Sequence, residues 1–303
     1  MIQNIVIIDE KETEKTKKGK SIMIIATYPN SHLKYDTIWS HLQCLSENID
    51  QIIISAPIGL EKNFSEFLEE VNSTMPDIGD RTKIEFYKND RYDYGLWCDS
   101  MTKGKILTLN ETNSSIFVGG TSKYDRFLLI NDSMMALEKT NKLLDELDAR
   151  NASFISLSYW GDKKDPNAKF WLESPVRAFS LKVIQIYADT VCFFPCEHFR
   201  RYCGKIFNTS HGFLKIQKRC IVEKTEIAII HQYQLDEVHG LYPGNDGTNR
   251  SWSNNFNFWS KVLRDNMSFP FAKVNNGPLY PAILRNRPEE TKRCTMKRKN
   301  EAN

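Results

Sequence analysis

The strongest strand signal in the chain is residues 124–130, with the sequence YDRFLLI. Its four consecutive apolar side chains end at Asn131-Asp132-Ser133, residue types that favour a turn or the start of a helix. Residues 137–147 then carry apolar side chains at helical spacing. A buried strand that ends in a turn and leads into an amphipathic helix predicts a βαβ unit, and therefore a parallel sheet.

Strand-like and helix-like segments alternate on both sides of this unit. Further strands are predicted at residues 22–27, 51–56, 83–87 and 152–160. Further helices are predicted at residues 35–45, 63–71 and 95–101. From about residue 175 the pattern is less regular and more helical. The predicted fold class is therefore α/β, with a mostly parallel sheet flanked by helices and an irregular helical C-terminal extension.

One folded domain, residues 21–288, is expected between two poorly packed ends. Residues 9–20 are a run of mixed charge, so residues 1–20 are predicted to be a mobile N-terminal segment. Residues 289–303 are rich in Lys and Arg and are predicted to be a basic, disordered tail.

The charge balance and the cysteines narrow the function classes. The formal net charge is +3, and the basic tail supplies much of it, so the near-neutral body argues against a nucleic-acid surface. The tail would give at most a weak peripheral contact with a membrane. No apolar run approaches the ~20 residues of a transmembrane helix. Because no signal peptide is recognised, the seven cysteines are expected to be reduced thiols in a cytoplasmic protein.

The predicted sheet indicates where a ligand would bind. In open α/β sheets, ligands bind beyond the carboxyl ends of the strands, near the point where the strand order reverses. None of the turns at these ends contains a GxGxxG motif or a P-loop, which disfavours a dinucleotide oxidoreductase and a P-loop NTPase. The residues at these ends that could contact a ligand are Thr27, Tyr28, Ser55, Asn89, Arg91, Asp93, Gly95, Asn131 and Asp132.

Two of these turns each allow a structural and a functional interpretation. Asp132 could cap the helix that follows. It could equally hold a metal-bound diphosphate or a sugar. Arg91 and Asp93 suit a local surface ion pair or a site for an anion at the start of a helix. There, Gly95 would permit close approach of the backbone.

Four sequence blocks resemble, in order, the rhamnan synthesis protein F family of glycosyltransferases. They are residues 89–97 (NDRYDYGLW), 124–133 (YDRFLLINDS), 223–229 (EKTEIAI) and 258–273 (FWSKVLRDNMSFPFAK). The opening Ala26-Thr27-Tyr28-Pro29-Asn30 is similar to the first turn of many GT-A transferases. The resemblance spans about residues 22–285 and implies a GT-A-like fold. Residues 21–160 would hold the nucleotide sugar and residues 161–288 the acceptor.

The resemblance implies a hexosyl- or deoxyhexosyltransferase that uses a nucleotide-diphosphate sugar, with rhamnose as one candidate, and a glycan acceptor. Glu226 lies in a matched block and is the candidate general base, with Glu173 or Asp236 as the alternatives. Asp132 would hold Mn²⁺, Mg²⁺ or the donor sugar. The other candidates for donor binding are Thr27, Tyr28, Ser55, Asn89, Arg91, Asp93, Gly95, Asn131 and Arg177. Tyr159, Trp160 and Trp171 are either core residues or a platform for acceptor sugars.

Two departures from the family pattern keep a second function open. Arg91 stands where the family has glycine, and the two-carboxylate metal motif is reduced to Asn131-Asp132-Ser133. The alternative is a catalytically inactive, carbohydrate-binding relative that organises a glycan-synthesis complex. A glycoside hydrolase is disfavoured, because no pair of carboxylates suited to flank one glycosidic bond is evident.

Overall fold

The computed structural model describes residues 19–29, 32–108, 122–160, 171–172, 176–192, 238–243 and 271–273. The expected mobile residues 1–18, the tail 289–303 and the helices expected after residue 192 lie outside the described residues. Gly19 and Lys20 belong to the folded part, since the backbone N–H of Lys20 donates to Asp125 Oδ2 at 3.0 Å.

Ten strands and six helices make up the described part of the chain. The strands are β1 (Ser21–Ala26), β2 (Gln51–Pro57), β3 (Thr82–Tyr87), β4 (Arg126–Asn131), β5 (Met134–Ala136), β6 (Phe154–Trp160), β7 (Trp171–Leu172), β8 (Val176–Ser180), β9 (Val238–Pro243) and β10 (Phe271–Lys273). The helices are α1 (His32–Leu45), α2 (Glu61–Thr74), α3 (Pro76–Gly79), α4 (Tyr92–Thr102), α5 (Lys142–Ala149) and α6 (Leu181–Val191).

Eight of the strands form one mixed sheet in the order β3-β2-β1-β4-β8-β6-β7, with β9 paired to β6. Strands β3, β2, β1 and β4 run parallel to one another, and β9 runs parallel to β6. Strand β8 is antiparallel to both β4 and β6, and β7 is antiparallel to β6. The α/β fold class predicted from the sequence is confirmed, and the parallel part of the sheet lies where the strand–helix alternation is clearest.

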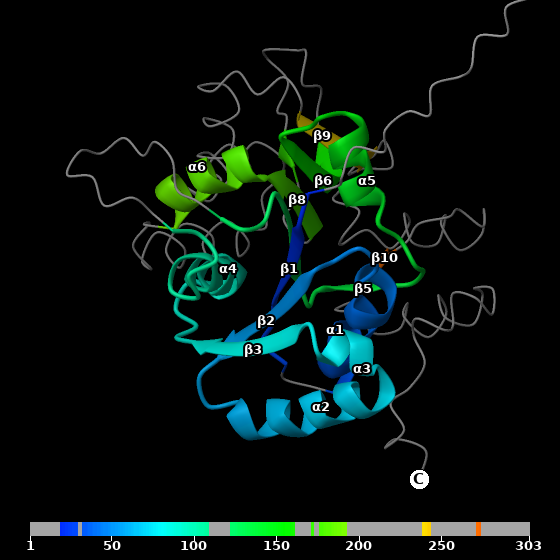
Figure 1. Ribbon diagram of the computed structural model, residues 1–303, viewed down its shortest axis with the longest axis vertical. Helices are drawn as coiled ribbons and strands as arrows, with labels where there is room; N and C mark the ends of the chain where they lie inside the picture. Colours follow the sequence, from blue (N-terminus) through cyan, green and yellow to red (C-terminus); the bar gives the residue numbers. More distant parts are fainter. Residues whose placement is uncertain are drawn as a thin grey trace, which may run out of the picture.

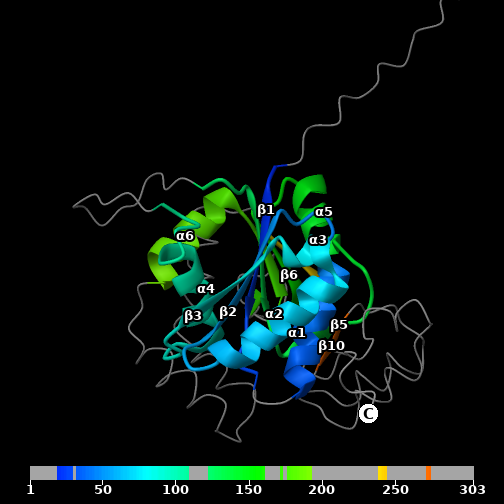
Figure 2. The same ribbon diagram turned by 60° about the horizontal axis from the view of Figure 1, so that its bottom comes forward.

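Helices cover both faces of the sheet, as Figures 1 and 2 show. Helices α1, α2 and α5 pack on one face of the sheet and share one hydrophobic cluster. Helices α4 and α6 pack on the other face and share a second cluster. Strand β1 contributes Met23 and Ile25 to the first cluster and Ile22 and Ile24 to the second. Because both of its faces are covered, β1 is a continuous apolar run rather than an alternating one.

The helix predicted at residues 137–147 begins later than expected. Residues Met134–Ala136 form β5, which pairs antiparallel with β10, and α5 begins only at Lys142. All three β5 residues are buried. The helical spacing carries no signal of this pairing, because the partner strand β10 lies more than 130 residues further along the chain. A tertiary contact therefore decides the backbone after β4.

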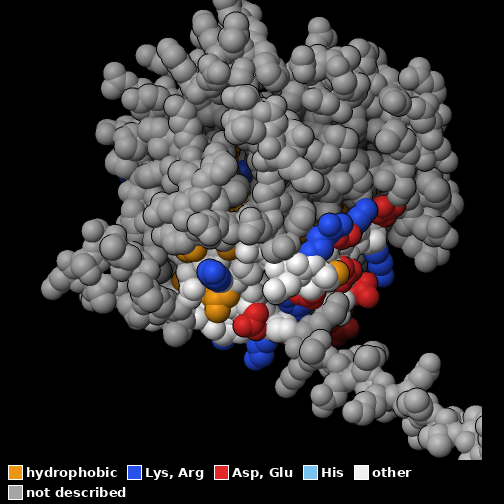
Figure 3. Space-filling model, turned by 90° about the horizontal axis from the view of Figure 1, so that it is seen from above, with side chains coloured by type: hydrophobic (Ala, Val, Ile, Leu, Met, Phe, Trp, Pro, Cys, Tyr) orange, Lys and Arg blue, Asp and Glu red, His pale blue; other side chains and the backbone are white. Residues whose placement is uncertain are grey.

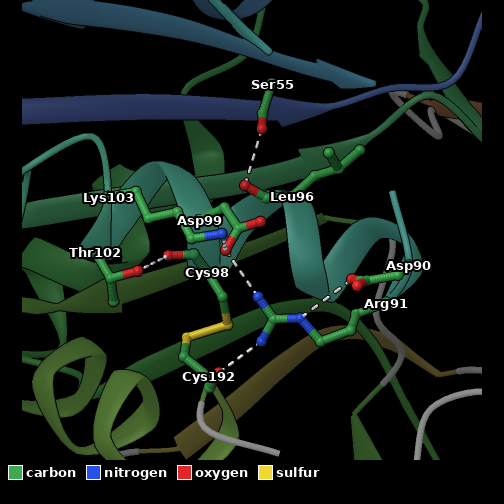
Figure 4. The surroundings of a disulfide bond; sticks show 9 residues. All are labelled: Ser55, Asp90, Arg91, Leu96, Cys98, Asp99, Thr102, Lys103 and Cys192. Carbon is green, nitrogen blue, oxygen red and sulfur yellow. Dashed lines mark hydrogen bonds and ion pairs between the residues drawn. A yellow bond between two sulfur atoms is a disulfide. The ribbon is translucent and has the colours of Figure 1, made fainter. Parts of the chain in front are cut away.

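The expected reduced state of the cysteines is corrected by a disulfide between Cys98 on α4 and Cys192 at the end of α6. Both residues are buried, and Cys44 is disulfide-bonded as well. Figure 4 shows Arg91 beside this bond: its guanidinium donates to the carbonyl of Cys192 at 2.6 Å and to Asp99 Oδ1 at 2.8 Å. The disulfide and this arginine together hold α4 against the end of α6.

The described surface shows charges of both signs close together. On the face drawn in Figure 3, Lys and Arg side chains lie beside Asp and Glu side chains. The part of this face that the structure describes therefore carries no large patch of one sign. Among all the residues that the structure describes, no helix is both long enough and apolar enough to cross a bilayer.

Removal of the Cys98–Cys192 bond is expected to lower the free energy of unfolding by about 2–4 kcal/mol, because the bond restricts the unfolded chain. The measurement is urea unfolding of the double variant Cys98→Ala/Cys192→Ala beside the wild type. Equal unfolding midpoints, together with alkylation of both cysteines in wild-type protein that is denatured without a reductant, would contradict the pairing.

Candidate functional site

The order of the strands reverses between β1 and β4. From β1 the chain passes to β2 and β3 on one side, and it then returns to place β4 on the other side of β1. The ladders end with Ala26 opposite both Ser55 and Asn131. The residues that follow β1 and β4 therefore meet at the edge where open α/β sheets bind ligands.

Asp132, directly after β4, is the centre of the contacts at this edge. Its Oδ2 accepts hydrogen bonds from the hydroxyl of Thr27 at 2.8 Å and from the backbone N–H of Tyr28 at 2.9 Å. Its Oδ1 accepts from Lys34 Nζ at 2.8 Å, and the same ammonium group donates to the Asp132 carbonyl at 2.7 Å. One carboxylate thus ties the end of β4 to the turn after β1 and to the first turn of α1.

Asn131 faces the opposite side of the sheet. Its Nδ2 donates to Asp93 Oδ2 at 2.6 Å, and its Oδ1 accepts from the backbone N–H of Ser133 at 3.0 Å. Successive side chains of a strand point to opposite faces, so Asn131 meets α4 while Asp132 meets α1. Asp93 and Asp132, both expected in one site, therefore make their contacts on different faces of the sheet edge.

Three predicted donor-binding residues make contacts within the fold. Ser55 is fully buried and its hydroxyl donates to the carbonyl of Leu96 at 2.9 Å. Arg91 donates to the carbonyl of Cys192, and its guanidinium also pairs with Asp99 and Asp90. A Cβ at Gly95 would lie 2.5 Å from the Cβ of Arg91, so this glycine makes room for Arg91.

Arg177 and Asn89 are two further candidates for donor binding. Arg177, on β8, is fully buried, and its guanidinium carbon lies 5.8 Å from the ring centroid of Tyr94 and 5.6 Å from that of Phe154. Such stacking on aromatic faces stabilises a buried guanidinium. Asn89 follows β3, and its buried Oδ1 has no hydrogen-bond partner among the described residues.

The predicted acceptor residues lie together on two paired strands. Trp160 of β6 is opposite Trp171 of β7, and Tyr159 is opposite Leu172. Their side chains are outside the described part, so the choice between core and sugar platform stays a prediction. Glu226, Glu173 and Asp236 also lie outside the described residues.

Sequence reasoning missed Lys34. This residue lies in the first turn of α1, and its side chain and that of Asp132 are each 13% exposed. The available signal was its place in the chain, since the first turn after a switch-point strand faces the ligand edge. Helical spacing alone gave no reason to separate Lys34 from an ordinary surface lysine.

His41 is a second polar residue on α1 that the sequence did not reveal. It is completely buried, and its Nε2 lies 2.7 Å from the carbonyl oxygen of Met134. Burial is the main cause that lowers the pKa of His41 to about 4, against a smaller upward effect of this hydrogen bond and of nearby Asp132. The imidazole is therefore neutral at pH 7 and anchors the segment that follows Asp132.

Comparison with known proteins gives no family. No protein-family model matches the chain, and no curated protein matches it. Membership of the rhamnan synthesis protein F family therefore stays a prediction from the sequence.

Three of the solved structures that match are remote in sequence. The WbbM bifunctional glycosyltransferase is 12% identical with a TM-score of 0.42, over 90% of this chain and 51% of that one. A putative glucose-1-phosphate thymidylyltransferase from Bacillus anthracis is 10% identical with a TM-score of 0.39, over 86% and 99%. The 4-diphosphocytidyl-2C-methyl-D-erythritol synthase of Anaerococcus prevotii is 11% identical with a TM-score of 0.38, over 77% and 93%. At these values the matches carry no inference about activity.

His41 is expected to make the folded state less stable as the pH falls. The unfolded chain binds a proton on His41 near pH 6.5, and the folded protein only near pH 4, so stability is retained above pH 6.5 and lost between these values. The loss in free energy of unfolding should total about 3 kcal/mol across this window. His41→Gln should remove this part of the pH dependence.

The measurement is urea unfolding of wild type and His41→Gln at pH 7.5, 6.5, 5.5 and 4.5. Carboxylates that titrate in both proteins cancel in the difference. A wild-type-minus-variant difference that stays constant with pH would contradict a neutral, buried His41.

Proposed function

We propose that the protein is a glycosyltransferase that moves a sugar from a nucleoside-diphosphate donor to a glycan acceptor. The observation that supports this most is the meeting of three separate sequence blocks at one edge of the sheet. Asn131 of the block 124–133 bonds to Asp93 of the block 89–97. Lys273, which ends the block 258–273, pairs with Met134, two residues after Asp132. These are blocks that resemble glycosyltransferases.

The polar groups at this edge suit the donor. A diphosphate needs positive charge and N–H donors, and a sugar needs carboxylate or amide groups that accept from its hydroxyls. Lys34, Asp132, Asn131 and Asp93 offer these groups around the ends of β1 and β4. In the reaction, the acceptor oxygen would form a bond to the anomeric carbon as the bond from that carbon to the diphosphate breaks. The acceptor's proton passes to a base, and the nucleoside diphosphate leaves.

The finer assignments follow from the sequence resemblance. The sugar would be a hexose or deoxyhexose, with rhamnose as one candidate, and the acceptor a glycan of a polysaccharide or glycoprotein. Glu226 would act as the base, and Tyr159, Trp160 and Trp171 would stack on the acceptor. A cytoplasmic location stays a prediction from the sequence. The Cys98–Cys192 disulfide weighs against it, because such bonds persist mainly in oxidising compartments.

The second candidate is an inactive, carbohydrate-binding relative. The observation that favours it is the single carboxylate at Asp132, whose oxygens are already bonded to Thr27, Tyr28 and Lys34. Such a protein would bind glycans without binding or cleaving a nucleotide sugar.

The test of the transferase is release of nucleoside diphosphate from a panel of UDP-, GDP-, CDP- and dTDP-sugars, with and without glycan acceptors. Asp132→Asn is expected to lower turnover by roughly 100-fold or more, because it removes a fixed charge at the reacting end of the donor. The matched control is Asp148→Asn. Asp148 lies on α5, and its carboxylate pairs with Arg126 at the amino end of β4. This variant should leave turnover near normal.

Near-normal turnover of a folded Asp132→Asn variant would leave Asp132 with a purely structural role. Binding of glycans without any binding of nucleotide sugars would support the inactive relative instead.

Glu226→Gln is expected to lower kcat by roughly 100- to 10,000-fold, because a general base acts in the chemical step. Binding of the donor should stay nearly unchanged, since the base contacts the acceptor. Pre-steady-state kinetics and donor titration separate the two effects. A Glu226→Gln variant with unchanged kcat would transfer the role to Glu173 or Asp236, which the same assay can test.

A further inference from the structure

We propose that the ammonium group of Lys34 provides the positive charge for the donor diphosphate, in the place where a divalent metal on Asp132 was expected. This inference rests on the proposed function, because it concerns how the same edge would bind a nucleoside diphosphate.

The first reason is that the carboxylate of Asp132 has little capacity left for a metal. A carboxylate offers about four lone-pair positions. Three are filled by donors from two segments: the Thr27 hydroxyl and the Tyr28 N–H of the turn after β1, and the Lys34 ammonium of α1. One position is left, on Oδ1, so a metal ion could bind this carboxylate only through that one oxygen unless it displaced one of these donors.

The second reason is the charge that already sits on this carboxylate. Lys34 Nζ lies 2.8 Å from Asp132 Oδ1. A divalent cation on the same group would stand beside a positive charge, which repels it strongly at a partly buried edge. The expected Mn²⁺ or Mg²⁺ at Asp132 therefore does not fit the residues that surround it.

The third reason is that, among the residues that the structure describes, no second carboxylate shares the position. With a single carboxylate, a metal ion at a phosphate site must take its other ligands from the substrate and from water, so a second carboxylate would hold it more firmly. Asp93, the other candidate, bonds to Asn131 on the α4 side of the sheet, whereas Asp132 contacts α1. The alternation of side chains along β4 thus separates the two acidic groups.

Lys34 itself has the properties that a phosphate contact needs. An ammonium group has three N–H donors, and two point at Asp132. The side chain is 13% exposed, so it is largely packed at the edge and keeps some contact with solvent. A lysine held by a carboxylate is pre-positioned, and lysine binds phosphate as a point charge. The third N–H can donate to a diphosphate oxygen.

The experiment uses the full chain and titrates UDP, GDP, CDP and dTDP by isothermal calorimetry, in EDTA and in MnCl₂. The expected wild-type result is binding of at least one nucleoside diphosphate with affinities within about twofold in the two buffers. Lys34→Met should weaken that binding by roughly 10- to 100-fold, and Lys34→Arg should retain most of it. In Lys34→Met, binding of the matching nucleoside monophosphate should weaken less than binding of the diphosphate.

Lys103→Met is the matched control, because Lys103 forms an ion pair of similar length, 3.0 Å, with Asp99 on α4. It should bind the nucleoside diphosphate as the wild type does. Thermal unfolding without nucleotide checks that each variant is folded. The comparison of EDTA with MnCl₂ needs only the wild type, so the proposal is tested even if Lys34→Met does not fold.

Three results would overturn the proposal. If wild-type binding is lost in EDTA and restored by MnCl₂, a metal supplies the charge, and the proposed glycosyltransferase stands. If folded Lys34→Met binds as tightly as the wild type, Lys34 only supports Asp132, and the transferase again stands. If none of the four nucleoside diphosphates binds in either buffer, the donor site fails together with the proposed function.

Discussion

The pairing of β1 with a parallel neighbour on each side is the constraint on which the rest of the structure depends. Strand β1 bonds to β2 along one side and to β4 along the other, and all six of its residues are buried. A strand bonded on both sides and covered on both faces has no polar backbone group left for solvent. The polar groups of this segment that can contact a ligand therefore lie beyond the end of β1, where Thr27 and Tyr28 follow.

The same pairing fixes the distance between residues that are far apart in sequence. Ala26 is opposite Asn131, so the next residues of β1 and β4 come within hydrogen-bonding distance: Thr27 and Tyr28 bond to Asp132. The alternation of side chains then directs Asn131 to Asp93 and Asp132 to Lys34. Two neighbouring residues thus serve opposite faces of one edge, which a linear motif cannot express. A site inferred from the motif alone would put both carboxylates around one ligand.

Electrostatics and burial then select roles among the polar residues. Ser55 and Arg91 are candidates for donor binding because they lie near strand ends. In the structure, Ser55 bonds to the carbonyl of Leu96. Arg91 bonds to Asp99 and to the carbonyl of Cys192. Lys34 and His41 were not candidates, although both pack from α1 toward the segment 131–134. Burial keeps His41 neutral, whereas the carboxylate of Asp132 keeps a cation at the edge. Two residues about two turns apart on one helix thus have different roles because their surroundings differ.

By itself, the sequence determined the α/β class, the parallel strands β1 to β4 with their helices, and the position of Asp132 at a strand end. These follow from local patterns, since buried strands are apolar runs and amphipathic helices repeat every 3.6 residues. Only the tertiary structure decided that Met134–Ala136 form a strand with Phe271–Lys273, that Cys98 bonds to Cys192, and that Lys34 neutralises Asp132. Each of these joins segments about 90 or more residues apart. Local periodicity carries no information about such partners, because chain closure over that distance is set by the packing of the whole sheet.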